Sequence, residues 1–143
     1  MYKNLVIILL IFLITVNMSV GETTDTETEI DIIIEEIFNA IDKNDISEVR
    51  KLLETKPYII NSARDTRTPL HWSCLTGKKD IVELLLSKGA DVNIKDNEGK
   101  IALHMAKTKE IAEMLIKKDS SVKAIDTNGK TPLFLACQYG RKD

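Results

Sequence analysis

The stretch TPLHWSCLTGKKDIVELLLSKGADVN, residues 68–93, decides the fold because its parts recur at fixed intervals. Its first four residues, Thr68-Pro69-Leu70-His71, return 33 residues later as Ile101-Ala102-Leu103-His104 and 30 residues after that as Thr131-Pro132-Leu133-Phe134. Repeats of this length are typical of solenoids, in which each unit buries its apolar face against its neighbours. The sequence therefore predicts a stack of small units.

Each full unit is predicted to begin with a helix. Thr68 and Thr131 can accept hydrogen bonds from the backbone amides of the first turn, and Pro69 and Pro132 stand where a missing N–H costs nothing. Gly77 is predicted to end this first helix.

A second helix is predicted to follow, with an apolar face formed by Ile81, Val82, Leu85 and Leu86. Asp80 and Glu83 have the spacing of a capping box, which predicts that Asp80 caps this helix. Asp45 and Glu48 have the same spacing one unit earlier.

These motifs resemble the ankyrin repeat, whose T-P-L-H and G-A-D-V-N sequences residues 68–71 and 89–93 match. The resemblance implies an all-α solenoid of helix-turn-helix units joined by short hairpin-like loops. It assigns residues 30–143 to repeats: a capping unit at about 33–62, a full unit at 63–95, a shortened unit at 96–125 and an incomplete unit at 126–143.

Two departures from the pattern matter. The third unit has Ile101-Ala102 in place of Thr-Pro and is three residues shorter between Ala106 and Ile111, so its first helix is expected to be uncapped and short. The fourth unit has a first helix and no second one before Asp143, which leaves apolar surface uncovered. This arrangement suggests a fragment, a truncated reading frame or a partner that completes the fold.

The N-terminal 21 residues have the layout of a signal peptide: Lys3, an apolar run from Leu5 to Val16, and small residues at Ser19 and Gly21 before a cleavage point at Glu22. The alternative is an uncleaved membrane anchor facing outside the cytoplasm. Residues 22–29 contain no apolar side chain and are expected to form an acidic, disordered tether.

Composition excludes several classes of function. The 143 residues carry 20 basic and 22 acidic side chains, a balance that excludes a strongly basic nucleic-acid binder. Two histidines and two cysteines are few candidate ligands for a zinc site. Cys74 and Cys137 occupy equivalent positions two units apart, roughly 20 Å for stacked helices, so they are expected to be free thiols.

No catalytic constellation occurs in the sequence, and neither a cofactor nor an enzymatic activity is expected. His71 and Cys74 have helical i, i+3 spacing. The resemblance assigns the histidine a bracing role between repeats and the cysteine a small core position. His104 occupies the equivalent bracing position. Phe134 stands at the third equivalent position, where a ligand could not be exchanged for phenylalanine.

The resemblance places the binding surface on the hairpin tips and the inner helix face. Carried over, the candidate partner-binding residues are Arg64, Asp65, Arg67, Lys95, Asn97, Glu98, Lys100, Ile125, Thr127, Asn128 and Lys130 at the tips, and Leu75, Thr76, Gln138 and Tyr139 on the inner helices. Five bases face two acids at the tips, which favours an acidic partner surface.

The sequence thus predicts an exported protein-binding module, periplasmic or secreted, that contacts a membrane only through an uncleaved N-terminal segment. One alternative is a secreted effector directed at a host. Another is a segment of a larger enzyme or transport protein. The sequence names neither the partner nor the oligomeric state.

Overall fold

The computed structural model describes residues 25–138 of the chain, and the side chains from Glu29 onward. The predicted signal peptide or anchor, Tyr139 and residues 22–24 of the predicted tether lie outside this part. The chain divides into two compact units, residues 1–33 and 34–143, and the repeats lie in the second.

Regular structure between residues 25 and 138 is entirely helical, which confirms the all-α prediction. The six α-helices are α2 (Asp25–Asp42), α3 (Ile46–Thr55), α4 (Pro69–Thr76), α5 (Lys79–Ser87), α6 (Lys109–Lys117) and α7 (Pro132–Gln138). Two 3-10 helices, η1 (Pro57–Asn61) and η2 (Ala102–Met105), complete the set.

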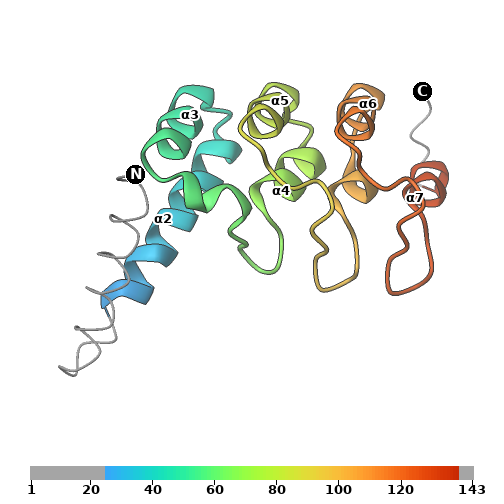
Figure 1. The fold of residues 1–143 in the computed structure, drawn as a ribbon, viewed down its shortest axis with the longest axis horizontal. Helices are drawn as coiled ribbons and strands as arrows, with labels where there is room; N and C mark the ends of the chain where they lie inside the picture. Colours follow the sequence, from blue (N-terminus) through green and yellow to red (C-terminus); the bar gives the residue numbers. More distant parts are fainter. Residues whose placement is uncertain (1–24, 139–143) are drawn as a thin grey trace, which may run out of the picture. The chain divides into compact units, whose positions relative to one another are not determined.

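The helices of residues 34–138 form two rows (Figure 1). The outer row contains α3, α5 and α6, and the inner row contains α4, η2 and α7, with long loops projecting beyond the inner row. Neighbours within each row pack on one another: α3 on α5 and α5 on α6, and α4 on η2 and η2 on α7. This is the stacking that the repeat predicted.

The core lies between the two rows. Ile81, Val82 and Leu85 of α5 are fully buried, as are Ile111 and Leu115 of α6. Burying one such side chain contributes about 1.5–3 kcal/mol, so packing between units stabilises these nine- and ten-residue helices, which are too short to be stable alone.

Several helix boundaries confirm the sequence predictions. Thr68 accepts a hydrogen bond from the backbone N–H of His71 (3.4 Å), and Thr131 accepts one from Phe134 (3.3 Å). Gly77 ends α4 in the left-handed conformation, with φ of 75°. This left-handed backbone conformation is the constraint that favours glycine there.

The predicted cap of the second helix was wrong. Lys78 is the N-cap of α5 and its side chain makes no capping hydrogen bond, while Asp80 lies within the first turn. Asp45 does cap α3, because its carboxylate accepts from the Glu48 N–H at 3.0 Å. The residue 33 positions after Asp45 is Lys78, so the repeat interval itself indicated the correct position.

The start of α2 corrects the predicted tether. The helix begins at Asp25, so residues 25–29 are helical where disorder was expected. Acidic residues in the first turns of a helix interact favourably with the positive end of its dipole, and this stretch contains Asp25, Glu27 and Glu29. The low hydrophobicity that predicted disorder did not take this local effect into account.

The third unit is shortened as expected. Its first helix is the four-residue η2, and no hydroxyl caps it because Ile101 stands at the cap position. The chain instead bonds directly to the preceding unit, where the Lys107 N–H donates to the Cys74 carbonyl at the end of α4 (3.2 Å). In the shortened unit, the connection between η2 and α6 therefore lies directly against α4 of the preceding unit.

The two cysteines have different environments. Both are free, which agrees with the sequence prediction. Cys74 is buried, and burial raises the pKa of its thiol. Cys137 was expected in an equivalent core position but is exposed, since no described helix covers that side of α7.

This difference predicts the thiol reactivity of the chain. A thiol reagent such as dithionitrobenzoate should label one cysteine in the native protein and both after denaturation, because a buried thiol with a raised pKa yields little thiolate. Mass spectrometry of the native adduct should place the label on Cys137. Rapid native labelling of Cys74 would contradict the packing described for α4.

Candidate functional site

Three loops project beyond the inner row, and we call residues 64–67, 95–100 and 125–130 the hairpin tips. In the second tip, the Asp96 carboxylate accepts from the backbone N–H groups of Glu98 and Lys100, both at 2.9 Å. These bonds hold the loop in one conformation, although Asp96 was not among the candidates from sequence.

Asp126 organises the third tip in the same way, accepting from Asn128 at 2.8 Å and Lys130 at 2.9 Å. The Lys130 N–H lowers the pKa of this carboxyl group. Sequence comparison of the units missed both aspartates, although D-x-x-G recurs at an interval of 30 residues and was a usable signal.

Adjacent tips are bonded to one another. The Asn97 N–H donates to the Thr66 hydroxyl at 3.2 Å, and the Thr127 N–H donates to the Glu98 carbonyl at 2.9 Å. Gly99 allows the second of these contacts, because a Cβ on it would lie 3.1 Å from the Thr127 nitrogen. The three loops therefore form a connected row.

The two histidines connect the inner helices to the tips, which is the bracing role that the resemblance implied. The His71 Nδ1 accepts from the Thr68 N–H at 3.3 Å, and its Nε2 lies 3.1 Å from the Lys100 carbonyl. His104 makes the same two contacts with Ile101 and Lys130, each at 3.2 Å. Each neutral ring therefore links the start of an inner helix to the next tip.

Burial lowers the pKa of both histidines, although the carbonyl contacts of Lys100 and Lys130 act in the opposite direction. Protonating Nδ1 would also place an N–H against the N–H that it now accepts. Because the folded-state pKa lies below the unfolded value of about 6.5, the unfolded chain takes up protons first as the pH falls.

The contribution of the two neutral histidines to the free energy of unfolding should therefore be fully present above about pH 6.5. It should decline as the pH falls below that value. Urea denaturation at pH 7.5 and pH 5.5 should show the lower midpoint at the acidic pH. A variant with His71→Gln and His104→Gln serves as the control and should lose much of this difference. A wild-type midpoint that stays constant or rises on acidification would refute the prediction.

Arg64 has a structural role that its predicted place at a tip did not suggest. Its guanidinium lies 4.3 Å from the Phe38 ring centroid and 5.4 Å from that of Trp72, and it pairs with Glu35 at 3.1 Å. Trp72 in turn donates to Asp42 at 2.6 Å. These contacts attach the capping unit to the second unit. The Arg64 guanidinium is therefore largely occupied by groups of its own chain.

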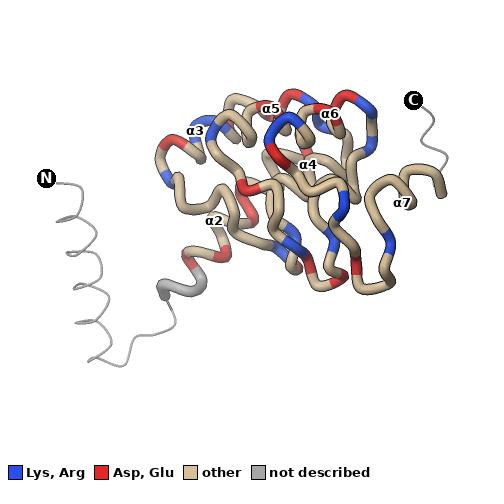
Figure 2. The backbone as a smooth tube through the Cα atoms, turned by 45° about the vertical axis from the view of Figure 1, so that its right-hand side comes forward, with Lys and Arg blue, Asp and Glu red and all other residues tan. Residues whose placement is uncertain are grey.

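Other bases at the tips also have partners within the chain. Arg67 lies 3.5 Å from both Asp96 and Glu98, and Lys100 pairs with Glu98. Lys130 contacts the Gln138 amide at 3.3 Å. Figure 2 shows that the loops carry both positive and negative residues. These pairs offset part of the positive charge that the sequence suggested.

The remaining candidates differ in accessibility. Leu75 and Thr76 on α4 are half-buried, as are Glu98 and Lys100 in the second tip. The exposed candidates are Asp65, Lys95, Asn97, Ile125, Thr127, Asn128 and Gln138. All but Gln138 lie on the hairpin tips, so the tips provide most of the accessible candidate surface.

In the part of the chain that the structure describes, no group of three or more His, Cys, Asp or Glu side chains is arranged to hold a metal ion. No helix among residues 25–138 combines the length and the apolar character that crossing a membrane requires.

Comparison with known proteins agrees with this geometry. A family model described as "Ankyrin repeats (3 copies)" matches residues 36–96 and 92–143. Matching proteins include the serine/threonine-protein kinase VIK of Arabidopsis thaliana, 49% identical over 55 residues, and mouse 26S proteasome non-ATPase regulatory subunit 10, 43% identical over 49 residues. A Caenorhabditis elegans homologue of a transient receptor potential cation channel is 35% identical over 83 residues.

These matches cover limited parts of each protein. They span 38%, 34% and 57% of this chain, and 13%, 21% and 7% of the kinase, the proteasome subunit and the channel homologue. The similarity is thus confined to a small part of each of these proteins.

Proposed function

The chain belongs to the ankyrin-repeat family, a family of protein-binding modules, and on this premise we propose that it binds a protein partner through its hairpin tips and the adjoining inner helix face, without catalysing a reaction. The observation that carries the proposal is the connected row of tips. Hydrogen bonds between the tips, together with those accepted by Asp96 and Asp126, fix the shape of the tips before binding. A preformed surface avoids much of the entropy cost of ordering loops.

The exposed residues of the tips specify the chemistry of the contact. Asn97, Thr127 and Asn128 offer hydrogen-bonding groups, and Lys95 is an exposed cation on the central tip. An acidic partner surface remains our proposal, and it rests mainly on Lys95 because the other bases at the tips contact groups within the chain. Such a contact should weaken as the salt concentration rises.

Site-specific photo-crosslinking tests the proposal. A benzophenone amino acid is placed at Asn97 in the full chain, and at Glu83 on the exposed face of α5 as the matched control. In an extract from the source organism, the tip position should give a discrete adduct that unlabelled wild-type chain competes away. A chain carrying Lys95→Glu and Thr127→Arg should compete poorly. Specific adducts at Glu83 alone, or equal competition by both chains, would overturn the proposal.

We also propose that the module acts outside the cytoplasm, either released or held by its N-terminal segment. Lys3 and the apolar run from Leu5 to Val16 support export. Residues 1–30 fused to a reporter should deliver it across the membrane, and a released protein should begin at Glu22. Reporter activity that stays in the cytoplasm would overturn this. A released product that interacts with a host would be an effector.

A second candidate is a repeat segment that serves a larger enzyme or transport protein. It is favoured by the small share of the kinase and of the channel homologue that this chain matches. Reading the coding sequence beyond codon 143 tests it. Further repeats or a catalytic region would support the larger protein, and a stop codon would refute it.

A further inference from the structure

The first hairpin tip is built differently from the other two. Asp96 and Asp126 each organise their own tip, but the residue at the equivalent position of the first tip is Ala63, which has no carboxylate. The chain there makes a tight turn instead, in which the backbone groups of Arg64 and Arg67 exchange two hydrogen bonds, each of 3.0 Å. The position of the first tip therefore depends on other contacts.

This turn holds a threonine in a conformation that threonine rarely adopts. A two-residue turn of this kind requires positive φ at both central residues, and glycine is strongly preferred as the second of them. The central residues here are Asp65, with φ of 50°, and Thr66, with φ of 72°. Gly99 and Gly129 stand at the positions equivalent to Thr66, and both have φ of 72°. A β-branched residue at this φ strains the backbone, and glycine at position 66 would avoid the strain.

The side chain of Thr66 supplies a reason for the threonine. Burial does not explain it, because Thr66 is exposed. Its hydroxyl accepts a hydrogen bond from the Asn97 N–H at 3.2 Å and so joins the first tip to the second. In the next pair of tips, the equivalent amide is that of Thr127, and it donates to the Glu98 carbonyl. A side chain therefore joins the first pair of tips, whereas a backbone carbonyl joins the second pair.

We propose that Thr66 is a positioning residue of the binding surface, whose hydroxyl holds the first tip in place against the second. Arg64 attaches the same tip to the capping unit through Phe38 and Glu35, so the first tip is held on both sides. Glycine at position 66 would relieve the strain but has no side-chain acceptor for the Asn97 N–H. The part of this proposal that concerns the partner rests on the proposed function of the tips.

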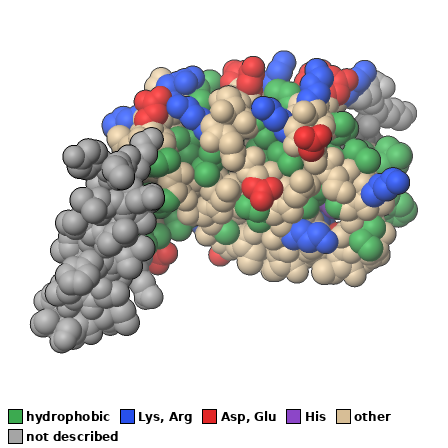
Figure 3. All heavy atoms as spheres, in the orientation of Figure 1, with side chains coloured by type: hydrophobic (Ala, Val, Ile, Leu, Met, Phe, Trp, Pro, Cys, Tyr) green, Lys and Arg blue, Asp and Glu red, His purple; other side chains and the backbone are tan. Residues whose placement is uncertain are grey.

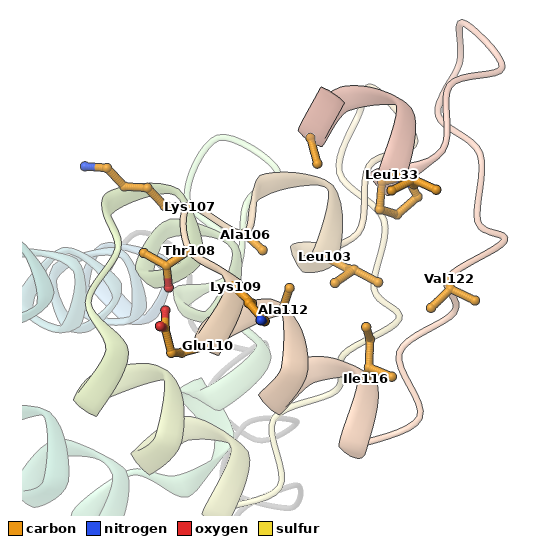
Figure 4. Close-up of a pocket in the computed structure, with 12 residues that line it drawn as sticks. Leu103, Ala106, Lys107, Thr108, Lys109, Glu110, Ala112, Ile116, Val122 and Leu133 are labelled. Atoms are coloured by element: carbon orange, nitrogen blue, oxygen red, sulfur yellow. The ribbon is translucent and has the colours of Figure 1, made fainter. Parts of the chain in front are cut away.

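The first tip is separate from the apolar groove of the chain. This groove, of about 680 Å³, lies beside α6 and α7 (Figure 4). Hydrophobic side chains also gather at the α7 end of the face in Figure 3. The described residues that line the groove belong to η2, α6, α7 and the segments on either side of α6, and the hairpin tips contribute none of them. Substitutions at Thr66 therefore leave the lining of the groove unchanged.

Three substitutions separate the hydroxyl of Thr66 from the shape of its side chain. Thr66→Val keeps the β-branched shape without the acceptor, Thr66→Gly removes both, and Thr66→Ser keeps the hydroxyl. Amide exchange rates are measured by nuclear magnetic resonance of the full chain. The Asn97 N–H should exchange about fivefold faster in the valine and glycine variants, the size of effect expected for the loss of one hydrogen bond. The serine variant should restore the wild-type rate.

The amide of Thr127 is the matched control within the same protein. It donates to the Glu98 carbonyl and should exchange at the same rate in the wild type and in all three variants. An unchanged rate at Asn97 in the valine variant would overturn the proposal. An equal increase at Asn97 and Thr127 would also overturn it, because the substitution would then have loosened the tips in general.

Competition for the cross-link at Asn97 tests whether the partner depends on the position of the first tip. Unlabelled Thr66→Ser chain should compete as well as the wild type, and Thr66→Val chain several-fold less well. Equal competition by these two variants, with the exchange rate at Asn97 changed, would overturn the role of Thr66 in binding. Absence of any specific adduct at Asn97 would refute the proposed function of the tips, whereas the exchange rates decide independently whether Thr66 holds the tips together.

Discussion

Replacing Ile101 with alanine should lower the free energy of unfolding by about 2–5 kcal/mol, the usual cost of removing a large aliphatic side chain from a core. Ile101 occupies the cap position of η2, where Thr68 stands at the start of α4, and it is only 1% exposed. Its side chain cannot cap the helix, so its contribution comes from packing. Urea denaturation followed by circular dichroism measures the loss.

Two further substitutions make this test specific. Ile101→Thr should cost less than alanine, because a hydroxyl at this position contributes a capping bond of about 1 kcal/mol that offsets part of the lost burial. Ile125→Ala removes an isoleucine that is 52% exposed in the third hairpin tip, and should change stability by no more than about 0.5 kcal/mol. Equal losses at Ile101 and Ile125 would contradict the packing of the shortened unit.

Replacing His71 with alanine should also lower the free energy of unfolding, for a different reason. The substitution leaves the buried Thr68 N–H without its imidazole partner, whereas the Lys100 carbonyl still accepts from the Asp96 N–H at 2.9 Å. We therefore expect a loss of about 1–3 kcal/mol in the free energy of unfolding, the cost of one buried and unpaired group, measured in the same denaturation experiment. The second tip should also lose its attachment to α4.

His71→Phe separates the loss of hydrogen bonds from the loss of volume. Phenylalanine fills most of the space of the imidazole, but it accepts and donates no hydrogen bond. The variant should therefore remain clearly less stable than the wild type. Stability equal to the wild type would show that His71 acts by packing alone.

Local sequence signals predicted the features that depend on neighbouring residues. Thr68 caps α4 and Gly77 ends it because both roles involve only adjacent backbone groups. The missing residues before Ile111 likewise predicted the shortened first helix of the third unit. The error at Asp80 came from using the capping-box spacing without the repeat interval, which places Lys78 opposite Asp45.

Features that depend on distant residues could not be predicted from local patterns. Arg64 looked like an accessible tip residue, but Phe38 and Glu35, both more than 25 residues away, hold its side chain. Cys137 matched Cys74 in its repeat position, yet its burial depends on a covering helix that the described chain does not place there. Both cases show that equivalent repeat positions can have different surroundings.

The affinity of the cross-linked partner for variants of the purified full chain tests the central claim, that the hairpin tips form the binding surface. Isothermal calorimetry compares the wild type with a chain carrying Lys95→Glu and Thr127→Arg at the tips, and with Glu83→Lys on α5 as the control. The account predicts at least tenfold weaker binding for the tip variant and unchanged binding for the control. Unchanged binding by the tip variant, with its fold intact, would contradict it.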